Sequence, residues 1–318
     1  MNAEVNAVPG PETAAVAAVG NPATRPFYWA VRRELWEHRS LYIAPLVPAG
    51  LVLVFMLLGS LNLTRGIHFS NDAMSPDQQL QAVTGIFVAV ATLVAIVASI
   101  TTFFYCLDSL YTERRDRSIL FWKSLPVADV TTVLSKLFIP AVVVPVIVFA
   151  IAIATQLIVL LVGTVVLLAH GISAATIWSP LNLLSMVAAL IYAMLVSALW
   201  LAPVYTWLVL VSSWARRSTF LWAVLPPLAV ILAEKLAFDT GYFAQMLRNR
   251  LGGAAQALVM HDHGHIRGFG FSPNTLSHIS NAFDPGNFFS SPGLWIGLAV
   301  AAGFVAATVW MRRYREPL

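Results

Sequence analysis

One segment of the sequence combines charged and aromatic side chains in a pattern typical of a docking surface. It runs from Glu113 to Val127 and reads ERRDRSILFWKSLPV. Its first five positions hold three arginines and two carboxylates, and an apolar and aromatic cluster follows directly. Exposed aromatics bordered by charge indicate contact with another protein. The alternative is that the arginines only satisfy the positive-inside rule and that Trp122 rests at a membrane interface.

A second group of side chains with chemical potential lies much later in the chain. His261, His263 and His265 stand beside Asp262, so three imidazoles and a carboxylate fall within five residues. Such ligands could hold zinc or copper, and their alternate spacing would place the imidazoles on one side of an extended chain. The flanks are rich in glycine, and the one cysteine, Cys106, lies far away in sequence. We expect a solvated loop, with metal binding or pH sensing as alternatives.

Sequence motifs of catalysis and nucleotide binding are absent. The chain has no GxxxxGK[ST] phosphate loop, no HExxH and no GxSxG. Proton-coupled carriers and intramembrane proteases place ionisable groups deep in the membrane, whereas the deepest polar side chains in the apolar stretches are Gln156 and a scatter of Ser and Thr. We therefore expect no catalytic residue, no bound cofactor and no energy source within this chain.

The composition indicates that the segments carrying these residues belong to a membrane protein. Of 318 residues, 58% are hydrophobic and only 11% are charged, and the mean hydropathy is +0.77. Globular proteins carry about 25% charged residues, so a soluble enzyme, a disordered chain and a nucleic-acid binder are excluded as first interpretations. Helices are the simplest way to take long apolar runs across a bilayer.

The sequence predicts an all-α membrane protein with six transmembrane helices and an N-terminal interfacial helix. Residues 1–24 are rich in alanine and proline and are predicted to be a disordered tail, followed by a six-span domain over 25–318. Asp129 is expected to cap the helix that leads into the third span, and Pro140 and Pro145 to bend its start. The predicted spans are 41–61, 82–107, 137–169, 183–211, 220–236 and 294–311.

The distribution of Lys and Arg predicts the orientation of the spans. Cytoplasmic termini, a cytoplasmic loop over 108–136 and a long external loop over 237–293 follow from it. The basic residues that this orientation places on the cytoplasmic side are Arg25, Arg32, Arg33, Arg39, Arg114, Arg115, Arg117, Lys123, Lys136, Arg216, Arg217, Arg312, Arg313 and Arg315.

The stretch Glu113–Val127, following the second span, closely resembles permease subunits of bacterial ABC exporters, the type-2 permease family. The segment FYWAVRRELWE at 27–37 resembles that family's N-terminal elbow helix, and the resemblance extends over about residues 25–316. It implies a multi-pass protein of the bacterial cytoplasmic (inner) membrane that pairs with two ABC ATPase subunits. ATP and Mg would bind those partners, and the second permease would be another copy or a related chain.

Within that resemblance, the loop would contact the ATPase and pass on its motion. The residues implied for this coupling are Glu113, Arg114, Arg115, Asp116, Arg117, Phe121, Trp122 and Lys123. The function expected is a permease subunit that moves an unidentified substrate outward. The alternative is a membrane-embedded structural or sensory protein whose histidine-rich external loop acts as the sensor.

Two further sets of residues follow from helical spacing. Phe27, Val31 and Leu35 share one helix face, and the tryptophans and arginines beside them suit the headgroup layer. The residues expected in this interfacial helix are Phe27, Trp29, Arg32, Arg33 and Trp36. Trp200, Trp207 and Gln156 are candidates for lining a transport pathway, and a helix-packing or lipid-facing stripe is the alternative for the tryptophans.

Overall fold

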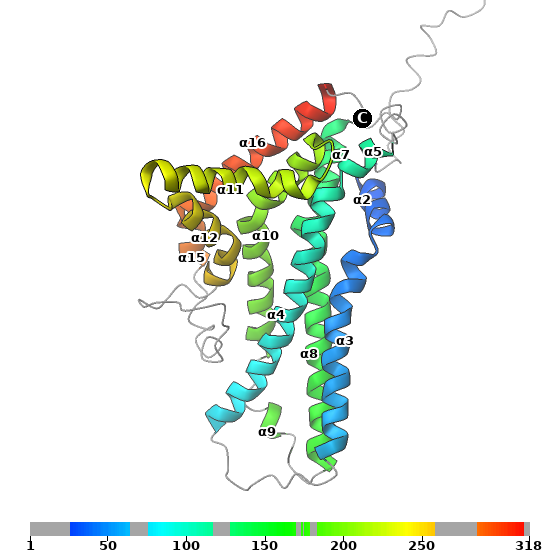
Figure 1. The fold of residues 1–318 in the computed structure, drawn as a ribbon. Helices are drawn as coiled ribbons and strands as arrows, with labels where there is room; N and C mark the ends of the chain where they lie inside the picture. Colours follow the sequence, from blue (N-terminus) through cyan, green and yellow to red (C-terminus); the bar gives the residue numbers. More distant parts are fainter. Residues whose placement is uncertain are drawn as a thin grey trace, which may run out of the picture.

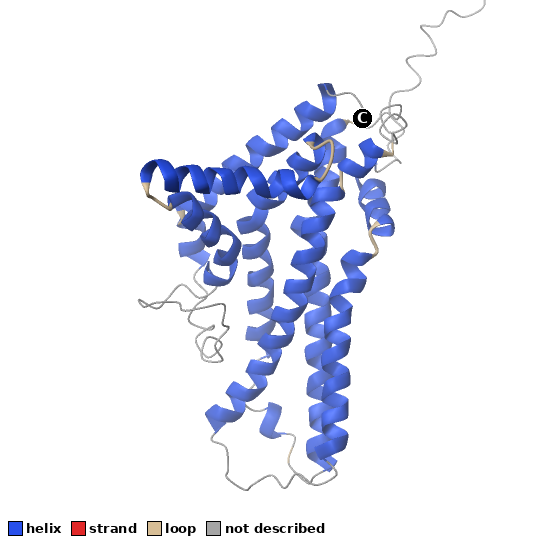
Figure 2. Cartoon of the chain, in the orientation of Figure 1, coloured by secondary structure: helices blue, strands red, loops and turns tan. Residues whose placement is uncertain are grey.

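The computed structural model describes residues 26–63, 76–116, 128–169, 173, 175–178, 183–257 and 285–314. All regular structure in these ranges is helical (Figure 2). The helices are α2 (Pro26–Glu37), α3 (Ser40–Leu63), α4 (Pro76–Asp108), α5 (Tyr111–Arg115), α7 (Asp129–Phe138), the π-helix η1 (Ile139–Val143), α8 (Val144–Ala169), α9 (Ala175–Trp178), α10 (Leu183–Trp214), α11 (Thr219–Phe238), α12 (Tyr242–Ala257), α15 (Pro285–Ser290) and α16 (Pro292–Tyr314).

Six helical stretches are long and apolar enough to cross a membrane, which confirms that part of the predicted fold class. They are Ser40–Gly59, Ala89–Arg115, Asp129–Ala169, Leu190–Trp214, Thr219–Phe238 and Pro292–Tyr314. Their large side chains are mostly exposed on the outer surface, as expected where the surrounding medium is lipid. The fold therefore indicates a multi-pass membrane protein.

Four of these helices form an elongated bundle. α3, α4, α8 and α10 run side by side along the long axis of the molecule, and α16 packs along the upper part of α10 (Figure 1). The main buried cluster lies towards one end, where Leu41, Tyr105, Ile139 and Val209 meet. This end also holds α2, α5 and α7 (Figure 1).

The third span is longer than its predicted range of 137–169. α7, η1 and α8 form one continuous helical stretch from Asp129 to Ala169, 41 residues long. At 1.5 Å per residue this stretch is about 60 Å long, twice the thickness of the hydrocarbon core. α7 is thus free to extend beyond the apolar layer. Pro140 lies in the π-helical turn, where a missing N–H is tolerated because the regular hydrogen-bond ladder is already interrupted.

α11 differs from the other candidate spans in its direction. It runs across the bundle rather than along it, and the chain then folds back into α12 (Figure 1). The carboxylate of Glu234 accepts hydrogen bonds from the backbone N–H groups of Tyr242 (2.7 Å) and Phe243 (2.9 Å). These N–H groups belong to the first turn of α12, where backbone donors have no acceptor within the helix. Glu234 therefore caps α12 and holds the turn between α11 and α12.

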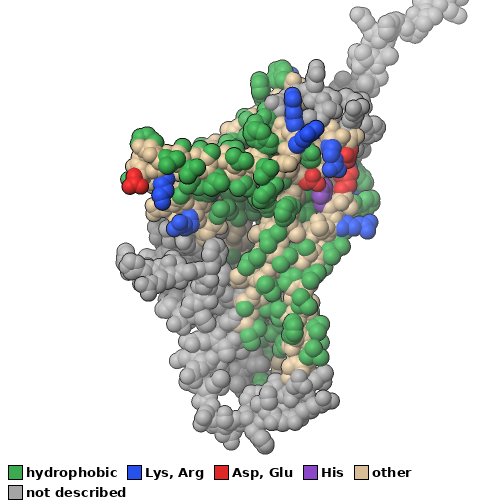
Figure 3. Space-filling view, in the orientation of Figure 1, with side chains coloured by type: hydrophobic (Ala, Val, Ile, Leu, Met, Phe, Trp, Pro, Cys, Tyr) green, Lys and Arg blue, Asp and Glu red, His purple; other side chains and the backbone are tan. Residues whose placement is uncertain are grey.

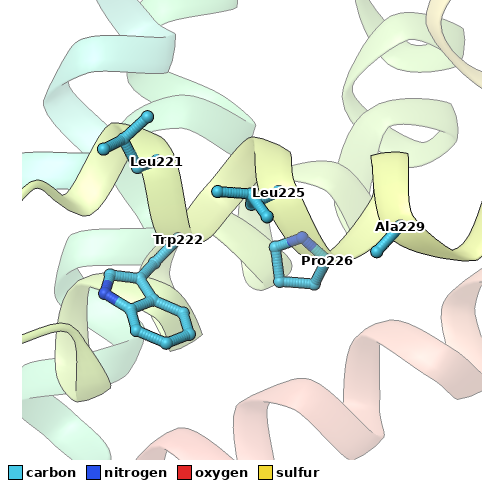
Figure 4. Close-up of a pocket in the computed structure, with 5 residues that line it drawn as sticks. All are labelled: Leu221, Trp222, Leu225, Pro226 and Ala229. Atoms are coloured by element: carbon cyan, nitrogen blue, oxygen red, sulfur yellow. The ribbon is translucent and has the colours of Figure 1, made fainter.

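The outer face of α11 carries a shallow apolar hollow of about 340 Å³ (Figure 4). It is lined by Leu221, Trp222, Leu225, Pro226 and Ala229, all from α11 itself. No ionisable side chain lines it, so the hollow offers nothing for acid–base chemistry or for binding a charged ligand.

Candidate functional site

The centre of the candidate site is the carboxylate of Glu113 in the short helix α5. Its Oε1 accepts from Lys136 Nζ of α7 at 3.1 Å, and its Oε2 accepts from Arg312 Nη1 of α16 at 2.9 Å. All three residues are buried, with exposed fractions of 7%, 2% and 7%. One carboxylate therefore joins the loop after the second span to the start of the third span and the end of the last.

On one side the contacts continue to the N-terminal helix. Lys136 Nζ also donates to Glu34 Oε1 of α2 at 2.7 Å. The hydroxyl of Tyr105, in α4, lies 3.1 Å from Glu34 Oε2 and 3.4 Å from the carbonyl oxygen of Lys136. In a regular helix that carbonyl would receive the N–H of residue 140, and Pro140 has none. The Tyr105 hydroxyl thus lies near a carbonyl oxygen that lacks its usual backbone donor because residue 140 is proline.

On the other side the contacts reach the first turn of α7. Arg312 Nε donates to Asp129 Oδ1 at 3.0 Å. The prediction that Asp129 caps α7 is wrong, because the capping position is Ala128 and no side chain bonds the free N–H groups there. Asp129 lies one residue further on, where its carboxylate pairs with Arg312 instead. We call Glu34, Glu113, Asp129, Lys136 and Arg312 the buried ion network.

The energetics of this network favour a single arrangement. Removing an ion from water costs several kcal/mol, and ion pairing repays that cost only when the geometry is good. Here each of the cations Lys136 and Arg312 bridges two carboxylates at 2.7–3.1 Å. Loss of one member would leave a buried charge without its partner. The network is therefore suited to holding helices together in register.

Arg114, next to Glu113, ties α5 to a further helix. Its guanidinium donates from Nη2 to the carbonyl oxygens of Ser212 (2.9 Å) and Ala215 (2.6 Å). These carbonyls lie at the C-terminal end of α10, where backbone acceptors lack helical partners and the helix dipole favours a cation. Arg114 thus caps α10, and α5 is anchored on α7, α10 and α16 together.

The residues predicted to contact an ATPase fall into three groups. Glu113 and Arg114 are buried in the contacts just described, so their side chains face the protein. Arg115 and Asp116 are exposed, with side-chain exposures of 60% and 54%, and pair with each other at 3.1 Å. The members that lie outside the described residues are Arg117, Phe121, Trp122 and Lys123.

The chain between α5 and α7 is attached to the network at both ends. Residues 117–127 begin one position after Asp116 and rejoin the described chain at Ala128. Glu113 lies in the helix that enters this segment, and Asp129 and Lys136 lie in the helix that leaves it. Glu113 and Asp129 are therefore the network members nearest to this segment along the chain.

The predicted N-terminal helix is present as α2, and its two faces differ. Glu34 is buried against Lys136, and Phe27 packs edge-on against Phe138 with ring centroids 5.3 Å apart. Trp29 and Trp36 are exposed at 56% and 66%. The placement of α2 in a headgroup layer stays a prediction.

The tryptophans of α10 contact neighbouring helices. Trp207 donates its indole N–H to the carbonyl oxygen of Ala223 in α11 at 3.2 Å, and Trp214 packs against Trp222 at 4.6 Å between ring centroids. Trp200 donates to the carbonyl oxygen of Asn249 at 3.2 Å. These are the contacts of a helix-packing stripe. A role of Trp200, Trp207 and the buried Gln156 in lining a pathway stays a prediction.

Within the described ranges, no group of three or more His, Cys, Asp or Glu side chains is placed to hold a metal ion. The weak metal candidates His261, His263 and His265 lie outside those ranges. Metal binding by these histidines stays a prediction.

Sequence reasoning did not single out Lys136 and Arg312 as partners of Glu113, or Glu34 as the second partner of Lys136. The sequence pattern did, however, mark Glu34 and Lys136 as ionisable residues in apolar surroundings. Glu34 lies on the helix face of Val31 and Leu35, and Lys136 directly precedes the apolar run of the third span. Ionisable residues at such positions are expected to have a partner, but the sequence does not say which one.

No family model, curated protein or solved structure matches the chain. The class that the fold itself indicates is a multi-pass membrane protein with six candidate membrane-crossing helices and a buried ion network at one end.

Proposed function

We propose that the chain is the transmembrane permease subunit of an ATP-binding-cassette export complex, driven by ATP hydrolysis on separate ATPase subunits. The observation that carries the proposal is the position of Glu113. It lies at the base of the predicted docking segment and is ion-paired with both the third and the last span. A partner that moves this segment would act directly on membrane-crossing helices.

The mechanism requires no covalent chemistry in this chain. Movement of residues 117–127 displaces α5, and buried ion pairs and rigid helices carry that displacement onward. Lys136 passes it to α7 and, through Glu34, to α2, whereas Arg312 passes it to α16. Arg114 adds a link to α10. The helices that would respond are therefore α2, α7, α10 and α16.

The π-helical turn at Ile139–Val143 gives α7 a place to move relative to α8. It begins three residues after Lys136 and contains Pro140. Interrupted hydrogen-bond ladders and prolines are the usual causes of helix bending. In this proposal α7 acts as a lever, and η1 is its hinge.

The proposal is tested by co-expression of the full chain with ABC ATPase subunits from the same organism and isolation through a tag on the chain. We expect the ATPase to co-purify with the wild type. Arg115→Glu should weaken that association at least tenfold, because Arg115 is exposed next to the docking segment. The matched control is Arg313→Glu, an exposed arginine of α16 outside the loop, which should leave it unchanged.

A second measurement separates docking from coupling. Glu113→Gln should retain the ATPase, because Glu113 is buried, but should abolish the ATP-dependent change in distance between spin labels at the exposed positions 130 of α7 and 230 of α11. Failure of any ABC ATPase to co-purify, together with stoichiometric zinc binding by the external loop, would favour the sensory alternative instead.

A further inference from the structure

The exposed face of α2 presents an arginine between two tryptophans. Trp29, Arg32 and Trp36 are spaced i, i+3 and i+7, so they fall on one side of the helix. The guanidinium carbon of Arg32 lies 5.2 Å from the ring centroid of Trp29 and 4.8 Å from that of Trp36. Both indoles are more than half exposed. The two rings therefore hold a cation at the surface by cation–π contact.

The charge of Arg32 has no acidic partner among the residues that the structure describes. Its neighbour Arg33 differs, because Arg33 Nε donates to Glu37 Oε1 at 2.6 Å. The other nearby carboxylate, Glu34, is turned into the protein and engaged by Lys136. A stacked guanidinium keeps its N–H donors in the plane of the group and available at its edge. Arg32 thus presents oriented, charged N–H donors that no described acidic side chain accepts from.

The chain connection keeps the end of α2 close to the first candidate span. Only His38 and Arg39 separate the end of α2 at Glu37 from that span, which begins at Ser40. The three steps from Glu37 to Ser40 reach about 11 Å at most, which is compatible with the predicted place of α2 in a headgroup layer. Basic and acidic side chains are both visible at this end of the molecule, others lie on the opposite flank, and the described part of the shaft below is largely hydrophobic (Figure 3).

We propose that Trp29, Arg32 and Trp36 form a binding site for the phosphate of an anionic phospholipid headgroup. Arg binds phosphate oxygens through two parallel N–H groups, and indoles favour the boundary between headgroups and acyl chains. The opposite face of α2 carries Glu34, so the lipid site and the buried ion network share one rigid helix. Headgroup charge therefore biases the position of α2. This inference does not depend on the proposed ATPase partner.

The test is native mass spectrometry of the full chain in detergent, titrated with phosphatidylglycerol or phosphatidylcholine. We expect phosphatidylglycerol to bind more tightly, and Arg32→Gln to weaken its first binding step about fivefold, the effect of one interfacial cation. The matched control is Arg33→Gln, which removes the same charge one position away and should have little effect. Arg32→Lys should fall between, because an ammonium group keeps the charge but not the planar fork.

Three outcomes would overturn the proposal. Equal weakening by Arg32→Gln and Arg33→Gln would show unspecific attraction of lipid to charge. Equal binding of the two lipids would show that the net negative charge of the headgroup is not recognised, because both lipids carry a phosphate. Competition by sn-glycerol 3-phosphate at concentrations equal to those of the lipid would point to a site for a soluble phosphate. If Arg32→Gln does not fold, Trp29→Leu with Trp36→Leu tests the same site and should give a comparable loss.

Discussion

Glu113 and Arg312 form an ion pair of 2.9 Å between residues 199 positions apart in the chain. The same carboxylate also holds Lys136, so a residue of a five-residue helix connects α7 and α16. Because all three side chains are buried, the pairs exchange little with water. This relationship makes the end of the molecule that carries α2, α5 and α7 one connected unit.

Neutralising Glu113 should destabilise the protein strongly. Glu113→Gln leaves two buried cations each short of one carboxylate, and breaking a buried ion pair from one side costs about 3–5 kcal/mol. The free energy of unfolding, measured by titration with SDS in mixed micelles, should fall by that order. Asp116→Asn is the matched control on the same loop. Its carboxylate is exposed, so its loss should change the free energy by less than about 1 kcal/mol.

Replacing Arg312 with lysine should also be costly, although the charge is kept. Arg312 donates to Glu113 from Nη1 and to Asp129 from Nε, and a lysine ammonium group does not reproduce this fork. We expect a loss of about 1.5–3 kcal/mol, the worth of one hydrogen bond to a charged group. Arg313→Lys, at the exposed neighbouring position, should be neutral. An unchanged free energy of unfolding in Arg312→Lys would mean that a positive charge alone satisfies the two carboxylates.

The hydrogen bond from Trp207 to Ala223 should be coupled to a proline. In a helix the carbonyl of Ala223 would receive the N–H of residue 227, and Pro227 has none. Trp207→Phe removes the indole donor and should cost about 1 kcal/mol. In a Pro227→Ala background the same change should cost less, because residue 227 then supplies a backbone donor. Purely additive effects in this double-mutant cycle would contradict the assignment.

A side chain at position 297 should displace Arg250, because Gly297 makes room for its guanidinium. A methyl group at position 297 would fall on the Arg250 guanidinium. That group also donates to the carbonyl oxygen of Gly293 at 2.6 Å and stacks 4.5 Å from the ring centroid of Trp200. Gly297→Ala should displace the Arg250 guanidinium and loosen α12 from α10 and α16, at a cost of about 1 kcal/mol, the worth of the lost hydrogen bond, because the end of a flexible side chain can move aside.

The control for that change lies in the same helix. Nothing lies within 4 Å of a methyl group built at Gly303, so Gly303→Ala should be neutral or slightly stabilising, since alanine favours a helix over glycine. Limited trypsin digestion reports on α12 directly. Cleavage after Arg248 and Arg250 should be faster in Gly297→Ala than in Gly303→Ala, and equal rates would count against the packing role of Gly297.

Much of the helical architecture could be predicted, because apolar composition and span length are local properties. The first predicted span, 41–61, lies within α3 at Ser40–Leu63, and the last, 294–311, lies within α16 at Pro292–Tyr314. The third span was underestimated, because Lys136 and Asp129 read as loop charges when their partners are unknown. The crosswise direction of α11 was not predictable either, since composition is blind to helix orientation (Figure 1).

The sequence by itself determined that this is a helical membrane protein, since a chain with 11% charged residues cannot cover its surface in water. It also marked Glu113–Val127 as unusual. Only the tertiary structure decided that Glu113 faces inward to Lys136 and Arg312 while Arg115 faces out. Hydrophobic periodicity reports the environment of a residue along its own helix. Ion pairs between residues a hundred or more positions apart depend on how the helices pack.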